Sequence, residues 1–75
     1  MTIEKIVDIL AEYLDVNKSE INDGTMLFFD YNLDDDDIFN IITLLQDEFD
    51  VEISAEEFSE LSSVEDIAEY IESLI

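Results

Sequence analysis

The fold is decided by residues 30–49, which read DYNLDDDDIFNIITLLQDEF. An apolar stripe with helical spacing follows directly after four consecutive acids. It begins at Ile38 and continues through Ile41, Ile42, Leu45 and Phe49. We therefore predict a helix that starts at about Asp35 or Asp36 and ends at Phe49.

The four aspartates at the start of this helix, Asp34, Asp35, Asp36 and Asp37, exceed what helix capping requires. An aspartate at a helix N-terminus accepts hydrogen bonds from free backbone N–H groups and is stabilised by the helix dipole. This explains one or two of the four, but four neighbouring carboxylates repel one another. We interpret the surplus charge as a docking surface for basic partners. A weak, charge-neutralising site for Ca²⁺ or Mg²⁺ at these four residues is the alternative, and no designed metal site is expected.

Composition limits the partners of the chain. Its 75 residues are enough for one small domain, residues 1–75, and 22 acids against two lysines give a formal net charge of −20. Such a charge repels nucleic acid and anionic lipid, so neither is an expected partner, and it steers association toward basic protein surfaces. We expect a monomer, and self-repulsion should make the stability of the fold rise with salt.

Residue types that are missing from the sequence narrow the chemistry. The chain has no His and no Cys, which excludes most transition-metal sites and the usual nucleophilic triads. Adjacent acids on an exposed helix start lack the enclosed pocket that acid–base catalysis needs, so we do not expect an enzyme. The absence of Cys, of a signal-peptide pattern and of an apolar run of about 18 residues fits a cytoplasmic protein.

The rest of the chain predicts a small all-α bundle of three longer helices and one short helix. A first helix begins near Thr2 or Ile3, and a long loop from Val16 to Leu33 follows. A short helix runs from Ala55 to about Glu60, with a capping box between Ser54 and Glu57. A last helix follows the cap at Ser63. The residues expected to anchor the loop are Val16, Ile21, Met26, Leu27 and Phe28, and those expected to face the core from the last helix are Val64, Ile67, Ala68, Ile71, Leu74 and Ile75.

Three segments, at matching spacing over nearly the whole chain, resemble the acyl carrier protein family. Asp30-x-x-Leu33-Asp34 resembles the family's Asp-Leu-Gly-x-Asp approach to its modified serine. Residues 45–53, LQDEFDVEI, resemble the segment that closes its second helix, and residues 63–71, SVEDIAEYI, resemble its last helix. The resemblance implies a four-helix carrier fold, a role in fatty-acid or polyketide biosynthesis, and synthase- or transferase-type enzymes as partners.

The chain departs from the family at its central motif, Asp-Ser-Leu followed by an acid. In this register Asp34 and Asp37 match the two acids, Asp35 stands at the position of the serine that carries 4′-phosphopantetheine, and Asp36 stands at the position of the leucine. A carboxylate cannot form the phosphodiester, so no cofactor is expected as the sequence stands. The family's apolar contacts at positions 36 and 43 are polar here. The serines elsewhere read as loop or capping residues: Ser19, Ser54, Ser59, Ser62 and Ser63.

Three explanations fit this departure: a natural homologue that has lost attachment but keeps the acidic docking face, a carrier whose serine was replaced, or a carrier fold used for a purpose unrelated to acyl groups. We favour the first, because a blocking replacement would not also need Asp36. The alternatives are a working acyl carrier protein and a cation-dependent acidic binding module. The residues expected to bind partners are Asp34, Asp35, Asp36, Asp37, Asn40, Thr43, Asp47 and Glu48.

Overall fold

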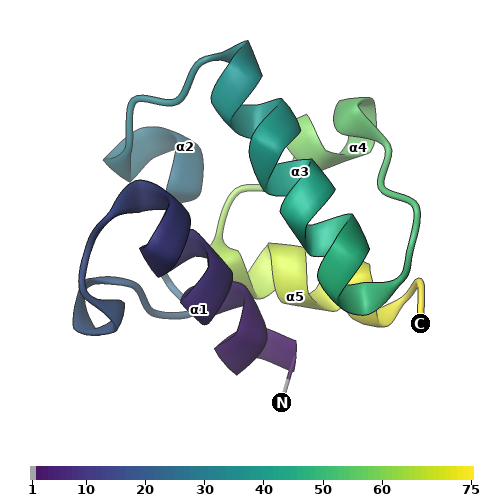
Figure 1. The fold of residues 1–75 in the computed structure, drawn as a ribbon, viewed down its shortest axis with the longest axis horizontal. Coiled ribbons are helices and arrows are strands. Elements are labelled where there is room, and N and C mark those ends of the chain that lie inside the picture. Colours follow the sequence, from purple (N-terminus) through teal and green to yellow (C-terminus); the bar gives the residue numbers. More distant parts are fainter. Residues whose placement is uncertain (1) are drawn as a thin grey trace.

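The structure, a computed structural model, describes residues 2–75 and consists of helices and their connections (Figure 1). In chain order the elements are α1 (Thr2–Leu14), the 3₁₀ turn η1 (Lys18–Glu20), α2 (Leu27–Asp30), α3 (Asp35–Phe49), α4 (Ala55–Ser59) and α5 (Val64–Glu72). The only β-type pairing in this part of the chain is an isolated antiparallel bridge between Met26 and Ser63. The all-α prediction is confirmed.

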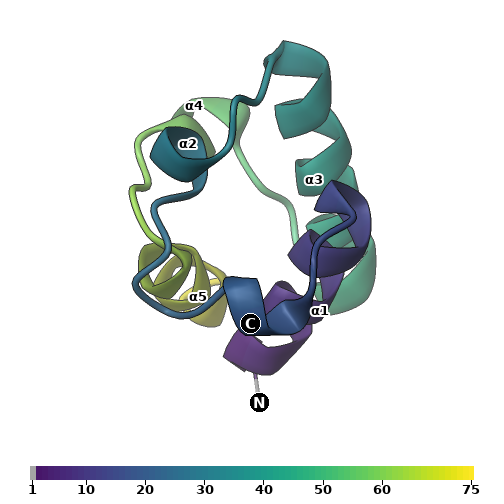
Figure 2. The ribbon, with the colours of Figure 1, turned by 90° about the vertical axis from the view of Figure 1, so that its left-hand side faces the viewer.

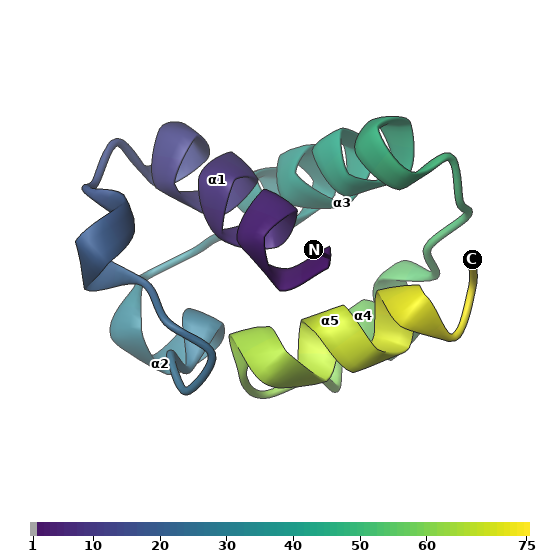
Figure 3. The ribbon, with the colours of Figure 1, turned by 90° about the horizontal axis from the view of Figure 1, so that it is seen from below.

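The helices lie in two layers. Figure 3 shows α1 and α3 in one layer and α2, α4 and α5 in the other, and Figure 2 shows the same division after a turn about a different axis. Helix α1 packs against both α5 and α3, and α3 packs against α4. The apolar stripes read from the sequence face each other across this interface, which is why each helix is stable only in the assembled bundle.

The core is built from the predicted stripes. The side chains with no exposed surface are Ile6, Leu10, Leu27, Ile41, Leu45, Phe58, Val64 and Ile71. Phe58 is the largest of them, and its ring meets the ring of Phe28 edge-on, with centroids 6.0 Å apart and planes at 85°. The short helix α4 thus contributes a central core residue despite its length.

The predicted loop between the first two long helices contains more structure than expected. It includes η1 and the single-turn helix α2, which its scattered turn residues did not reveal. The anchoring prediction holds: Ile21 and Leu27 are buried, and Val16, Met26 and Phe28 are partly buried. The loop also caps α5, because the carbonyls of Thr25 and Asp23 accept hydrogen bonds from the backbone N–H groups of Val64 and Glu65 at 3.0 and 2.9 Å.

Two details of the C-terminal half were predicted wrongly. Helix α5 ends at Glu72, so Leu74 and Ile75 leave the helical register and are 40% and 67% exposed. Ser54 caps α4 by accepting from the Glu57 N–H at 3.3 Å, but the reciprocal half of the expected capping box is missing. The Ser54 N–H and the Glu57 carboxylate bind the Tyr70 hydroxyl instead of each other: the hydroxyl accepts from the Ser54 N–H and donates to the Glu57 carboxylate.

Helices α1 and α3 end in the same way. Asp15 and Asp50 adopt left-handed backbone conformations, with φ of 58° and 54°, where glycine is the usual residue. The following N–H groups, of Val16 and Val51, bond back to the carbonyls of Ala11 and Gln46 at 3.0 and 3.3 Å, as in a Schellman motif. Among the described helices none is long and apolar enough to span a membrane.

The burial of Phe58 predicts a large stability effect. Phe58→Ala removes a fully buried ring and should lower the free energy of unfolding by about 3–5 kcal/mol, a large share of the stability of a small domain. Phe29→Ala is the matched control, because Phe29 is 88% exposed and its loss should change stability by no more than about 0.5 kcal/mol. Urea unfolding followed by circular dichroism measures both; equal losses would contradict this core assignment.

Candidate functional site

The start of α3 uses two of its four aspartates for capping. Asp34 is the N-cap residue, and its carboxylate accepts from the Asp37 N–H at 2.9 Å. Asp37 returns the interaction by accepting from the Asp34 N–H at 3.2 Å, which makes a complete capping box. These two acids are therefore accounted for by local structure.

A tyrosine from α1 fixes the position of Asp37. The Tyr13 hydroxyl donates to the Asp37 carboxylate at 2.8 Å and accepts from the side-chain amide of Asn40 at 3.2 Å. One oxygen of the Asp37 carboxylate accepts from the Asp34 N–H, and the other accepts from the Tyr13 hydroxyl. The end of α1 is thus tied to the first turns of α3 by a short polar network.

The network shifts the pKa values of its two ionisable side chains in opposite directions. The pKa of Asp37 lies below its ordinary value of 3.8, first because of the hydrogen bond from Tyr13 and then because of the backbone bond from Asp34. The hydrogen bond from Asn40 lowers the pKa of Tyr13, but the bond to Asp37, desolvation and the charges of Asp37 and Asp34 outweigh it and hold that pKa above 10.0. Asp37 is therefore a firmly ionised acceptor.

Asp35 and Asp36 take no part in this network. Both are exposed in the first turn of α3, and neither carboxylate forms a hydrogen bond or ion pair with any residue in the described range 2–75. They are the surplus charge that capping does not explain. Figure 1 shows this end of α3 projecting beyond the neighbouring elements at the edge of the molecule.

An apolar hollow lies beside Asp35, between α3 and α4. It has a volume of about 380 Å³, and its wall from α3 includes Asp35, Ile38 and Phe39, while α4 contributes Ala55 and Ser59. The sequence predicts that Ser59 lies in a different helix from Asp35, but it does not indicate that both residues line the same hollow. We call this the α3–α4 hollow.

From the sequence we expect Phe39 to pack against the core, as most aromatic residues of the chain fall at core spacing. This expectation is wrong, because the side chain is 68% exposed, one turn after Asp35. Its position at the flank of the stripe, rather than at its centre, is the signal that could have found it. The polar residues at positions 36 and 43 therefore do not make the outer face of α3 wholly polar, because Phe39 and the partly exposed Leu44 supply apolar surface.

The remaining residues expected to bind partners differ in whether their side chains already form hydrogen bonds or ion pairs within the protein. Asn40 is engaged with Tyr13, and the Thr43 hydroxyl donates to the Phe39 carbonyl at 3.0 Å. Glu48 lies 3.7 Å from the ammonium group of Lys5 in an exposed ion pair, an interaction that contributes little to stability. Asp47 is exposed.

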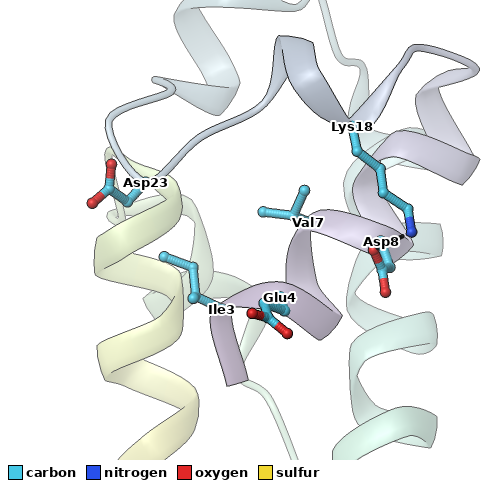
Figure 4. A pocket seen from close by; sticks show the side chains of 6 residues that line it. All are labelled: Ile3, Glu4, Val7, Asp8, Lys18 and Asp23. Atoms are coloured by element: carbon cyan, nitrogen blue, oxygen red, sulfur yellow. Dashed lines mark ion pairs between the residues drawn. The ribbon is translucent and has the colours of Figure 1, made fainter. Parts of the chain in front are cut away.

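Another hollow, beside α1, is lined mainly by charged residues. This open hollow of about 550 Å³ lies between the start of α1 and the loop after η1, and Figure 4 shows its side chains. The ammonium group of Lys18 there is held by Asp8 at 2.8 Å, while Glu4 and Asp23 add negative charge. Over residues 2–75, no three acidic side chains are grouped so as to hold a metal ion.

Fold and site together define a small carrier-type helical domain with an acidic start to its longest helix. Comparison with known proteins agrees: residues 4–71 match the family model described as "Phosphopantetheine attachment site". The chain is 37% identical over 73 residues to an acyl carrier protein of Clostridium acetobutylicum, covering 97% of this chain and 95% of that one. It is 29% identical over 72 residues to an acyl carrier protein of Helicobacter hepaticus, covering 96% and 95%. The chain belongs to the acyl carrier protein family.

The polar network predicts a specific change in titration. Tyr13→Phe removes the hydroxyl that stabilises the charged form of Asp37, so the pKa of Asp37 should rise toward 3.8. The lowered pKa of Asp37 stabilises the folded protein fully at pH values above its ordinary pKa, and this stabilisation is lost as the pH falls through the lowered pKa. The variant should therefore lose less stability than the parent as the pH falls below about 4. Carboxyl-carbon NMR titration measures the pKa.

Tyr31→Phe is the control for this titration. The Tyr31 hydroxyl makes no hydrogen bond to residues 2–75, so its removal should leave the Asp37 titration unchanged. An unaltered Asp37 pKa in Tyr13→Phe would show that the tyrosine does not hold the carboxylate in solution.

Proposed function

We propose that this chain is an acyl-carrier-type domain that docks basic partner proteins through the acidic start of α3 and carries no 4′-phosphopantetheine there. The observation on which the proposal rests is Asp35. It is exposed in the first turn of α3 beside an apolar hollow, and in the register of the family motif it occupies the position of the modified serine.

The residues around Asp35 do not fit the prosthetic group. Positions 34–37 are all aspartate, and a carboxylate cannot form the phosphodiester that a serine hydroxyl forms. Ser59 lies on the other side of the hollow, but its hydroxyl donates to the Glu56 carbonyl at 2.8 Å. The hydroxyls of Ser54 and Ser63 cap helices. No hydroxyl group replaces the missing serine at the helix start.

The same surface is well suited to recognising a basic protein. Asp35 and Asp36 are unpaired by any cation of residues 2–75 and stand at one end of α3, with the exposed ring of Phe39 one turn away. An aromatic contact surrounded by charge is typical of an interface in which the ring contributes affinity and the charges contribute orientation and association rate. The expected partners are synthase- or transferase-type enzymes, and the domain itself is not catalytic.

A working acyl carrier protein of fatty-acid or polyketide biosynthesis is the second candidate. The names of both relatives and the α3–α4 hollow favour it, and it requires a serine at position 35 in the active form. A cation-dependent binding module is less well supported, because the described acids form no group arranged around a metal.

Intact-mass measurement separates the first two candidates. After incubation with coenzyme A and a broad-specificity phosphopantetheinyl transferase, the wild-type chain should keep its mass. A gain of one phosphopantetheine would overturn the proposal and establish a working carrier.

Asp35→Ser is the matched variant for this experiment. It restores a hydroxyl at the start of α3 and leaves Asp34 and Asp37 to cap the helix, so the variant should gain one phosphopantetheine under the same conditions. If it remains unmodified although folded, the transferase does not recognise this helix start, and the docking part of the proposal fails.

A further inference from the structure

Phe29 is an exposed aromatic residue on a firmly held turn. It is 88% exposed, although it lies in α2 between well-anchored neighbours. Leu27 is fully buried, Phe28 packs edge-on against Phe58, and the Asp30 carboxylate accepts from the Met26 N–H at 3.1 Å. The backbone therefore presents the Phe29 ring to solvent in a fixed position.

A hollow lies beside this ring, between α2 and the end of α4. It has a volume of about 210 Å³; Met26, Phe28 and Phe29 form one wall, and Ser59 and Leu61 belong to the other. Ser59 also lines the α3–α4 hollow, so the two hollows lie on either side of the end of α4. We call the second one the α2–α4 hollow.

The charge around the α2–α4 hollow is of one sign. Asp30 adjoins Phe29 in α2, Glu60 lines the hollow, and both are exposed. The two lysines of the chain are paired elsewhere, Lys5 with Glu48 and Lys18 with Asp8. An occupant must therefore bring its own positive charge. A second copy of a chain with net charge −20, or an anionic lipid surface, would be repelled.

We propose that the α2–α4 hollow is a second docking surface, which takes one apolar side chain of a basic protein segment. Phe29 and Leu61 contact that side chain, and Asp30 and Glu60 pair with lysine or arginine residues on either side of it. Protein interfaces usually have an apolar centre surrounded by a polar or charged rim. One apolar contact with an ion pair on each side has the same arrangement on a smaller scale. This surface is separate from the start of α3 and does not depend on the residue at position 35.

The test uses two synthetic peptides as probes. One carries a single leucine between two pairs of lysines, and the other carries alanine in its place. Titration into the ¹⁵N-labelled full chain should shift the backbone amides of residues 26–30 and 59–62, and the leucine peptide should bind several-fold more tightly than the alanine peptide.

Three variants locate the binding. Phe29→Ser should weaken the leucine peptide by roughly tenfold, and Glu60→Lys should weaken both peptides. Ile75→Ser is the matched control, because it removes another strongly exposed apolar side chain, one that lines neither hollow, and should leave the affinity unchanged. The ¹⁵N spectra also show whether each variant is folded.

Three results would overturn the proposal. Equal affinity for the leucine and alanine peptides would mean general attraction to an acidic protein. Shifts confined to residues 35–47 would place the probe on α3, which would support docking at α3 while excluding the second surface. Equal weakening by Phe29→Ser and Ile75→Ser would show that the Phe29 ring has no specific part in binding.

Discussion

The reciprocal capping of Asp34 and Asp37, held by Tyr13, determines what the rest of the molecule can present. It fixes the first turn of α3, joins that turn to the end of α1, and occupies two of four neighbouring carboxylates with hydrogen bonds. Because the two capping acids are engaged, Asp35 and Asp36 remain as the carboxylates of this turn with no hydrogen-bond or ion-pair partner among residues 2–75. The same short network thus accounts for the stability of the helix start and for the chemistry exposed on it.

The distribution of charge limits how this small domain is stabilised. With a net charge of −20 the folded chain repels itself, and its two ion pairs are exposed, so they offset little of that repulsion. Stability must come from the apolar layer between α1–α3 and α4–α5, where Phe58 and its neighbours are closed to solvent. Added salt should strengthen the fold and at the same time weaken every contact with a basic partner, because screening acts on both.

Much of the fold could be predicted because helical periodicity and capping are local. The start of α3 at Asp35 and the cap at Ser63 follow from residues within one turn of each other. The arrangement of distant residues could not be predicted: the sequence does not show that Tyr13 bonds to Asp37, that Tyr70 replaces Glu57 at the Ser54 N–H, or that Ser59 and Asp35 line one hollow. The exposure of Phe39 could not be predicted for the same reason, since it depends on which face of the helix packs against a neighbouring element.

The most direct test of the account compares two double variants with the same loss of charge. Asp35→Asn with Asp36→Asn removes the free acids of α3, whereas Glu65→Gln with Glu69→Gln removes two exposed acids of α5. The measurement is the dissociation constant of each protein for a broad-specificity phosphopantetheinyl transferase, by calorimetry at low and moderate salt. We predict roughly tenfold or greater weakening for the α3 pair, little change for the α5 pair, and a smaller salt dependence for the α3 pair. Equal weakening by the two pairs would show that net charge alone governs binding and would contradict a docking surface at the start of α3.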